Sequence, residues 1–245
     1  EWGLEFRDIN RAIAGTGLLR GERRRRRHRQ VTPAQLVGIE AGVDPALELL
    51  TDDQEASLTG RAFNRWFERT LADPPEGVRR VLRRRGNPRE QLLRAARDLV
   101  GRRDHPAPWR REPFDRDAAI DACVEAVRGV AALAELANAP NDKLAQNLSR
   151  LGRWLAELDA REAIRPRDHD GLEAELYELR NDRDNWKHRW FGQWYGDGLL
   201  RQDVLTRRDA LAEELDRFLD RAGADLAPVL VRDLAPVVEA YEQLK

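Results

Sequence analysis

The last 22 residues of the chain carry its clearest structural signal, an apolar stripe with helical spacing. The members of the stripe recur at steps of four and three: Leu226, Leu230, Leu234, Val237, Tyr241 and Leu244. This spacing puts them on one face of an α-helix. Pro228 suits a first helical turn, but Pro236 falls inside the pattern, where it lacks a needed N–H. The stretch predicts two helical pieces that share one buried face and follow a helix over 200–222 that Gly223 ends.

The same periodicity, interrupted by proline and glycine, recurs between residues 50 and 222. It predicts helices over 51–71, 76–85, 88–100, 118–136, 142–159 and 172–190. The 142–159 segment has a leucine seam suited to packing against an antiparallel neighbour, made of Leu144, Leu148, Leu151, Leu155 and Leu158. Runs of β-branched residues are few. The sequence therefore predicts an all-α fold, an irregular bundle of about eight to ten helices.

Two regions are expected along the chain. Residues 1–38 form a basic N-terminal segment, expected to be partly disordered, in which Arg20–Arg29 holds seven arginines against Glu22. This run is either a phosphate-binding arm or a solvated linker. Residues 39–245 form a helical domain with a possible sub-boundary near 138–141. Because the chain has no methionine and ends inside a helical pattern, we expect it to be a fragment of a larger protein.

Composition narrows the class of protein. One cysteine allows no internal disulfide, and no apolar run approaches the roughly 20 residues of a membrane helix. We therefore expect a soluble, cytoplasmic protein. The net charge of −1 is unevenly spread, because residues 79–111 carry twelve arginines against three acidic residues. A segment with this charge could face a polyanion.

The candidate nucleic-acid contacts lie in that basic segment and in a second cluster of cations and tryptophans. The first group is Arg79, Arg80, Arg83, Arg84, Arg85, Arg102, Arg103, Trp109, Arg110 and Arg111, and the second is Lys187, Arg189 and Trp190. Arginines contact phosphates, and tryptophans stack on bases. Packing remains an alternative for the aromatic residues. Trp109 could plug its proline-rich loop onto the helices, and Trp186 and Trp190 have the spacing of a helical packing pair.

Catalytic signatures are absent from the sequence. It has no GxxxxGK[ST] phosphate loop, dinucleotide fingerprint, HExxH motif, paired-cysteine zinc pattern or GxSxG elbow. The adjacent Asp168, His169 and Asp170 lack metal-ligand spacing and are interpreted as a solvated turn. We therefore predict no catalytic, cofactor-binding or metal-binding residue in this chain.

The order of several segments resembles UvrD-like superfamily 1 DNA helicases, most of all the AddA/RecB helicase–nuclease type. The likeness rests on EAGVDPALELL, PPEGVRRVLRRR, RAARDLVGRRDHPAPWRREPFDRDAAID and the C-terminal ADLAPVLVRDLAPVVEAYEQLK, and covers roughly 40–245. It implies an accessory insertion, called 1B, that contacts duplex or forked DNA in bacterial recombination or double-strand break repair. The ATP and Mg²⁺ sites of such an enzyme lie on other segments, which would be the partner domains of this chain. Residues 1–38 do not match the family pattern.

A second hypothesis is a helical protein–protein interaction scaffold with no nucleic-acid role. It assigns the leucine seam and the tryptophan-rich end to the docking of another protein. It also fits the expectation that Val237, Val238 and Tyr241 form an exposed edge where the remainder of a larger protein packs.

Overall fold

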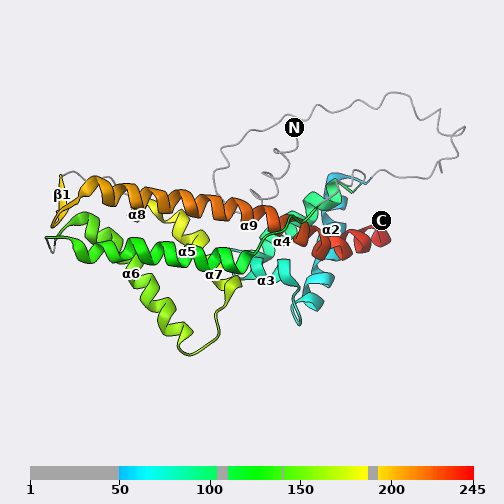
Figure 1. Cartoon of the computed structure of the whole chain (residues 1–245). Coiled ribbons are helices and arrows are strands. Elements are labelled where there is room, and N and C mark those ends of the chain that lie inside the picture. Colours follow the sequence, from blue (N-terminus) through cyan, green and yellow to red (C-terminus); the bar gives the residue numbers. More distant parts are fainter. Residues whose placement is uncertain (1–49, 104–109, 140, 187–192) are drawn as a thin grey trace, which may run out of the picture.

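The computed structural model describes residues 50–103, 110–139, 141–186 and 193–245 (Figure 1). These residues form an all-α fold, as predicted, with seven helices of seven or more residues, slightly fewer than expected. The helices are α2 (Asp52–Thr70), α3 (Glu76–Leu82), α4 (Pro88–Gly101), α5 (Arg116–Ala131), α6 (Lys143–Glu162), α7 (His169–Asn181) and α9 (Arg201–Leu244). A 3₁₀ helix, η2 (Ala132–Leu136), a single turn, α8 (Arg183–Trp186), and two short strands, β1 (Trp194–Gly196) and β2 (Leu199–Leu200), complete the described part.

Helix α9 is continuous over 44 residues and runs along the length of the molecule (Figure 1). The prediction of a break at Gly223 and of two later pieces was wrong, because α9 passes through Gly223, Pro228 and Pro236. Each internal proline removes a helical hydrogen bond and costs about 3 kcal/mol. Burial of the predicted stripe on both sides of Pro228 offsets this cost, since Leu226, Leu234 and Tyr241 have no exposed surface.

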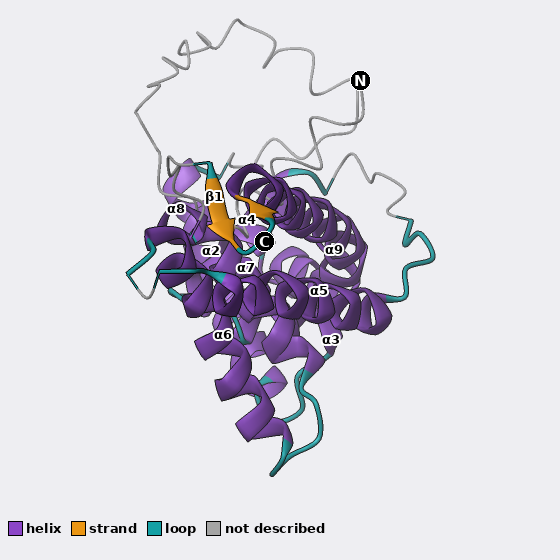
Figure 2. Cartoon of the chain, turned by 60° about the vertical axis from the view of Figure 1, so that its left-hand side comes forward, coloured by secondary structure: helices purple, strands orange, loops and turns teal. Residues whose placement is uncertain are grey.

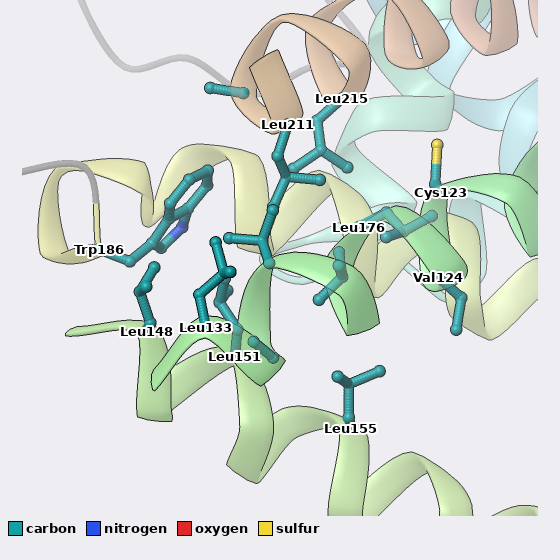
Figure 3. Close-up of a cluster of buried hydrophobic side chains, with 14 of the residues drawn as sticks. Cys123, Val124, Leu133, Leu148, Leu151, Leu155, Leu176, Trp186, Leu211 and Leu215 are labelled. Carbon is teal, nitrogen blue, oxygen red and sulfur yellow. The ribbon is translucent and has the colours of Figure 1, made fainter. Parts of the chain in front are cut away.

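The first half of α9 covers one of two hydrophobic cores. We call this part the acidic lobe, comprising the described residues from 110 to 222, which have a formal charge of −7. The predicted leucine seam of α6 lies inside this core (Figure 3), and α6 packs beside α5, η2 and α8. Trp186 is also buried, and its Nε1 donates to the Leu179 carbonyl at 3.0 Å. Helices η2 and α6, which precede and follow residues 138–141 in the sequence, contribute to one core.

The second half of α9 closes the other core together with α2, α3 and α4. We call this part the basic lobe, comprising residues 50–103 and 223–245, which have a formal charge of +3. Thr51 caps α2 in a reciprocal capping box with Gln54. The expected exposed edge on α9 was wrong, since Val237 and Tyr241 are fully buried in this core.

A tight hairpin ends the acidic lobe, where β1 pairs antiparallel with β2 (Figure 2). Gly198 has a φ of +72° in the turn, a conformation that glycine adopts without strain. Gly196 lies so close to η2 that an added Cβ would be 2.0 Å from the Leu136 carbonyl oxygen. The Tyr195 carbonyl accepts from the Asn138 N–H at 2.9 Å, which fixes the hairpin against the end of η2.

Candidate nucleic-acid interface

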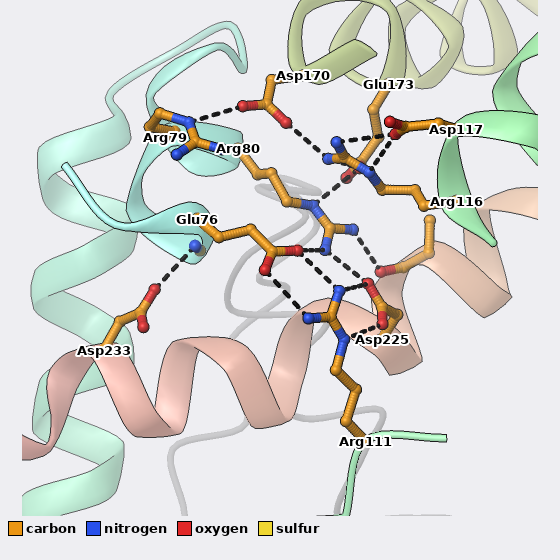
Figure 4. A network of polar contacts seen from close by, with 12 residues as sticks. Glu76, Arg79, Arg80, Arg111, Arg116, Asp117, Asp170, Glu173, Asp225 and Asp233 are labelled. Carbon is orange, nitrogen blue, oxygen red and sulfur yellow. Dashed lines mark hydrogen bonds and ion pairs between the residues drawn. The ribbon is translucent and has the colours of Figure 1, made fainter. Parts of the chain in front are cut away.

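An ion-pair network joins the two lobes, and Arg80 is at its centre (Figure 4). The Arg80 side chain has no exposed surface. Its Nε donates to Glu173 at 2.9 Å, and its Nη1 donates to Asp225 at 2.7 Å. Its Nη2 donates to the Ala222 carbonyl at 3.0 Å. Arg80 therefore connects α3 to α7 and α9, and as a buried residue it is not available for the nucleic-acid contact expected of it.

Arg111 occupies the other side of the same network. It donates to both carboxylate oxygens of Glu76, at 3.0 and 2.7 Å, and through Nε to Asp225 at 2.6 Å. Although burial alone would raise it, hydrogen bonds from Arg111 and Arg80 hold the pKa of Asp225 below its ordinary value. Asp225 is therefore a carboxylate that two arginines share, and it anchors both to α9.

Three more predicted contacts form ion pairs with acidic side chains of the protein. Arg79 donates to Asp170 at 3.0 Å. Arg84 contacts Glu173 at 3.4 Å, with its Cζ 5.4 Å from the centroid of the Tyr177 ring. Arg103 pairs with acidic residues of α2 and α9, Glu55 at 3.2 Å and Glu242 at 2.7 Å. These arginines stabilise the packing of helices, so the positive charge of 79–111 does not form one outer face.

The remaining predicted residues are divided between the surface and the undescribed stretches. Arg83 is 57% exposed and pairs with Asp168 at 3.0 Å. Arg85 and Arg110 are exposed, and Arg102 is half-buried. The predicted contacts Trp109, Lys187, Arg189 and Trp190 lie outside the described residues.

A stripe of arginines on α2 was missed in the sequence. Arg61, Arg65 and Arg69 are exposed and follow each other at intervals of four, so they share one face about 6 Å apart along the helix. None of the three forms an ion pair with another described residue. Like charges at this spacing cost roughly 0.2–0.5 kcal/mol per pair. The interval of four residues between these arginines was the signal available in the sequence. Phe63 and Trp66 lie on the inner side of the same helix.

Arg89 of α4 extends this surface. Its Nη2 donates to the Oδ1 of Asn64, a residue of α2 between Arg61 and Arg65, at 2.6 Å. Its Cζ lies 5.7 Å from the centroid of the Phe63 ring. The hydrogen bond and the ring position the guanidinium without neutralising it. We call Arg61, Arg65, Arg69 and Arg89 the α2 arginine stripe.

Groups with catalytic potential are few in the described part of the chain. It contains no cluster of three His, Cys, Asp or Glu side chains that could hold a metal ion. Burial raises the pKa of the Cys123 thiol to about 12, so it is a protonated core residue. Asp168 caps α7, and His169 faces Asp117 and Asp121 at 3.6 and 3.2 Å.

An open groove of about 890 Å³ lies between α6 and α7. It is lined by charges of both signs, including Arg150, Arg161, Glu157 and Glu175. A second cavity of about 340 Å³ adjoins it at the turn between α3 and α4, and Arg85, Glu178 and Asn181 line both. Two residues that line the smaller cavity each have a buried polar atom with no hydrogen-bond partner among the described residues, Arg84 Nε and Gln91 Oε1. An unpaired buried group of this kind costs about 1–3 kcal/mol.

Exposed apolar side chains gather at the hairpin end of the acidic lobe. Trp194 is 58% exposed and pairs in register with Leu200, and the nearby Leu136 is 53% exposed. We call these three residues the hairpin tip. The leucine seam, which the scaffold hypothesis assigned to docking, is buried in the core. Among the described residues, the hairpin tip is the apolar surface on which another protein could dock.

Comparison with known proteins adds no relative. No protein-family model, no curated protein and no solved structure matches the chain. The described part also contains no helix long and apolar enough to cross a lipid bilayer.

Proposed function

We propose that this chain is a DNA-contacting accessory domain of a bacterial, cytoplasmic ATP-dependent DNA helicase or exonuclease of recombination or double-strand break repair. The observation that carries the proposal is the α2 arginine stripe. Its four exposed guanidiniums lie on the basic lobe, and no carboxylate of the described residues pairs with them. A surface of unneutralised arginines is what phosphate recognition requires.

Such a surface would hold DNA by its backbone. Each guanidinium offers several donors to phosphate oxygens and displaces condensed counterions, which gives affinity without reading the sequence. Arg85 and Arg110 are further exposed cations that could add to the contact, whereas Arg80 and Arg84 are removed from it by burial. The resemblance to UvrD-like helicases supplies the context, in which other segments of the parent protein bind ATP and Mg²⁺.

The salt dependence of DNA binding tests the proposal. Fluorescence anisotropy with duplex, forked and single-stranded oligonucleotides should detect binding at about 50 mM salt that weakens steeply as salt rises. Changing Arg61, Arg65 and Arg69 to Gln should reduce the slope of log K against log salt by about 2.7, or 0.9 per lost phosphate contact on duplex DNA.

The matched control changes three exposed arginines of the acidic lobe, Arg153, Arg165 and Arg207, to Gln. It removes the same charge but should leave the slope within about 0.5 of the wild type, since no phosphate contact is lost. Equal losses in both variants would indicate a general charge effect. No binding at about 50 mM salt to any of the three DNA forms would contradict the proposal.

The hairpin tip favours a second candidate function, docking of another protein, for example the remaining helicase domains. Light scattering and pull-down with those domains would compare the wild type with Trp194→Ser. Loss of association with unchanged DNA binding would assign the tip to the protein partner, and unchanged association would exclude it.

A further inference from the structure

We infer that the cavity between the α3–α4 turn and the end of α7 binds a phosphate group, with Arg84 at its base. We call it the Arg84 cavity. This inference goes beyond DNA contact by the α2 arginine stripe and does not depend on it, because none of the four stripe residues lines this cavity.

The first observation is the incomplete pairing of Arg84. Glu173 is shared by three arginines, at 2.9 Å from Arg80, 3.3 Å from Arg116 and 3.4 Å from Arg84. Arg80 and Arg116 each have a second carboxylate, Asp225 and Asp170 respectively. Arg84 has only Glu173, at the longest of the three distances. Among the buried cations of the junction, Arg84 therefore has the least compensated charge.

The second observation is that this cation has unused donors. The Arg84 side chain is nine-tenths buried, and its Nε has no acceptor among the described residues. Its Nη1 likewise makes no hydrogen bond with a described residue. Burial is the main cause that holds the pKa of Arg84 below its ordinary value, against the opposing effect of Glu173. A phosphate oxygen would supply both the acceptor and the negative charge.

The rest of the lining suits the same ligand. Exposed Arg85 and Arg94 line the cavity and attract anions toward it. Gly86 and Asn87 bring in the start of α4, a 14-residue helix whose N-terminus carries partial positive charge. Glu90 and Glu178 also line the cavity, so three arginines face two carboxylates. The remaining excess favours one small anion.

Gln91 gives the ligand a way in. Its Oε1 has no partner, and its Nε2 is held only by a 3.5 Å contact to the Arg85 carbonyl. Because Arg84 Nε and Gln91 Oε1 are both shielded from solvent, a phosphate reaches Arg84 when the Gln91 side chain turns and donates its amide to the ligand. Binding thereby gives Arg84 Nε the acceptor that it lacks in the free protein.

Titration of the full chain with inorganic phosphate and with dimethyl phosphate, at constant ionic strength, tests this site. Calorimetry should give saturable binding with a dissociation constant on the order of 1 mM, as expected for a few charge-assisted hydrogen bonds to a small anion. In NMR spectra the Nε–Hε signal of Arg84, assigned by its loss in Arg84→Lys, should shift along the same curve.

Two variants that leave the junction intact keep the test valid if Arg84→Lys folds poorly. Arg94→Glu, at an exposed position, should weaken phosphate binding about tenfold, which corresponds to one lost charge-assisted contact. Gln91→Leu should also weaken it, while leaving thermal stability unchanged or higher, since a buried unpaired amide is removed. Arg153→Glu, the matched control on α6, should change the affinity less than about twofold.

The source of the phosphate is decided by competition. If duplex DNA displaces inorganic phosphate, the cavity holds a backbone phosphate; if it does not, the ligand is free phosphate or a phosphate monoester. Both outcomes support the site. Absence of saturable binding by both small probes, or equal affinity in Arg94→Glu and the wild type, would overturn it. The α2 stripe variant should retain phosphate binding, so failure of the proposed function would be seen separately.

Discussion

The two lobes share one helix but differ in the side chains of their cores and in the sign of their formal charge. The basic lobe has an aromatic cluster on α2, made of Phe63, Trp66 and Phe67, and the arginines Arg61, Arg65 and Arg69 on the other face of this helix pair with no described carboxylate. The acidic lobe has an aliphatic leucine seam, and many of its arginines pair with its own carboxylates, as Arg128 does with Asp159 and Arg167 with Glu162. The formal charge of a segment therefore does not predict how much unneutralised charge its surface carries. Much of the +9 of residues 79–111 is neutralised at the junction.

The ion-pair network between the lobes should give the largest change in the free energy of unfolding, and its loss shows whether the two lobes unfold together. Arg80→Met should lower the free energy of unfolding by about 3–5 kcal/mol, because the buried carboxylates of Glu173 and Asp225 would each lose their shortest or fully buried ion pair and keep only partly exposed or longer ones. Urea denaturation measures the loss, and hydrogen exchange of α4 and α6 peptides shows whether both lobes are affected. Arg79→Met, at a half-exposed pair, is the control and should cost at most about 1 kcal/mol. A loss for Arg80→Met no larger than that of the control would refute the role of the junction.

Replacing one glycine in each lobe with alanine should give stability effects of opposite sign, smaller than the effect of Arg80→Met. Gly196→Ala in the acidic lobe should cost about 1–3 kcal/mol, since the new methyl group would overlap the Leu136 carbonyl. Gly60→Ala in α2 of the basic lobe meets nothing within 4 Å and should stabilise by about 0.4–1 kcal/mol. Thermal unfolding of both variants measures the contrast. Effects of the same sign would show that the close approach at Gly196 is not as described.

The cap of α2 gives a smaller, local effect. Thr51→Ala should cost about 1 kcal/mol, because the Gln54 N–H loses its acceptor and the capping box is lost. Hydrogen exchange should accelerate in the first turn of α2, while α6 amides keep their wild-type rates. Equal acceleration in α6 would mean that the basic lobe does not open on its own.

The smallest effect near neutral pH concerns Asp225. Its folded pKa lies below the unfolded value of about 3.9, so the folded state binds fewer protons in acid. The stability from this carboxylate is therefore fully present above about pH 4 and lost as pH falls through the folded pKa. Urea midpoints between about pH 7 and 3 should fall less for Asp225→Asn than for the wild type. Parallel curves would contradict this linkage.

Local signals in the sequence predicted much of the fold. Helices α2, α4 and α6 lie where the apolar spacing placed them, and the leucine seam packs against neighbouring helices. These features depend on residues a few positions apart, which a sequence shows directly. Gly223 and Pro236 favour the end of a helix, but α9 continues through both. Packing of α9 against α2, α3 and α4 outweighs the free-energy cost of these residues.

The candidate site was harder to predict for a physical reason. In the run from Arg79 to Arg85, five arginines look alike, and only the carboxylates of Glu173 and Asp225 decide which one is buried. Those acids lie 93 and 145 positions from Arg80, so no local pattern contains them. The α2 arginine stripe needed only helical spacing and could have been predicted.

The continuity of α9 makes it a molecular ruler. At 1.5 Å per residue, its 44 residues span roughly 65 Å, and they fix the distance between the hairpin tip at its start and the basic lobe at its end. Both cores pack against this one helix, so a mechanical force applied at one end of α9 would be transmitted to the other. A chain built this way can set how far a partner at the tip stands from whatever the arginines hold.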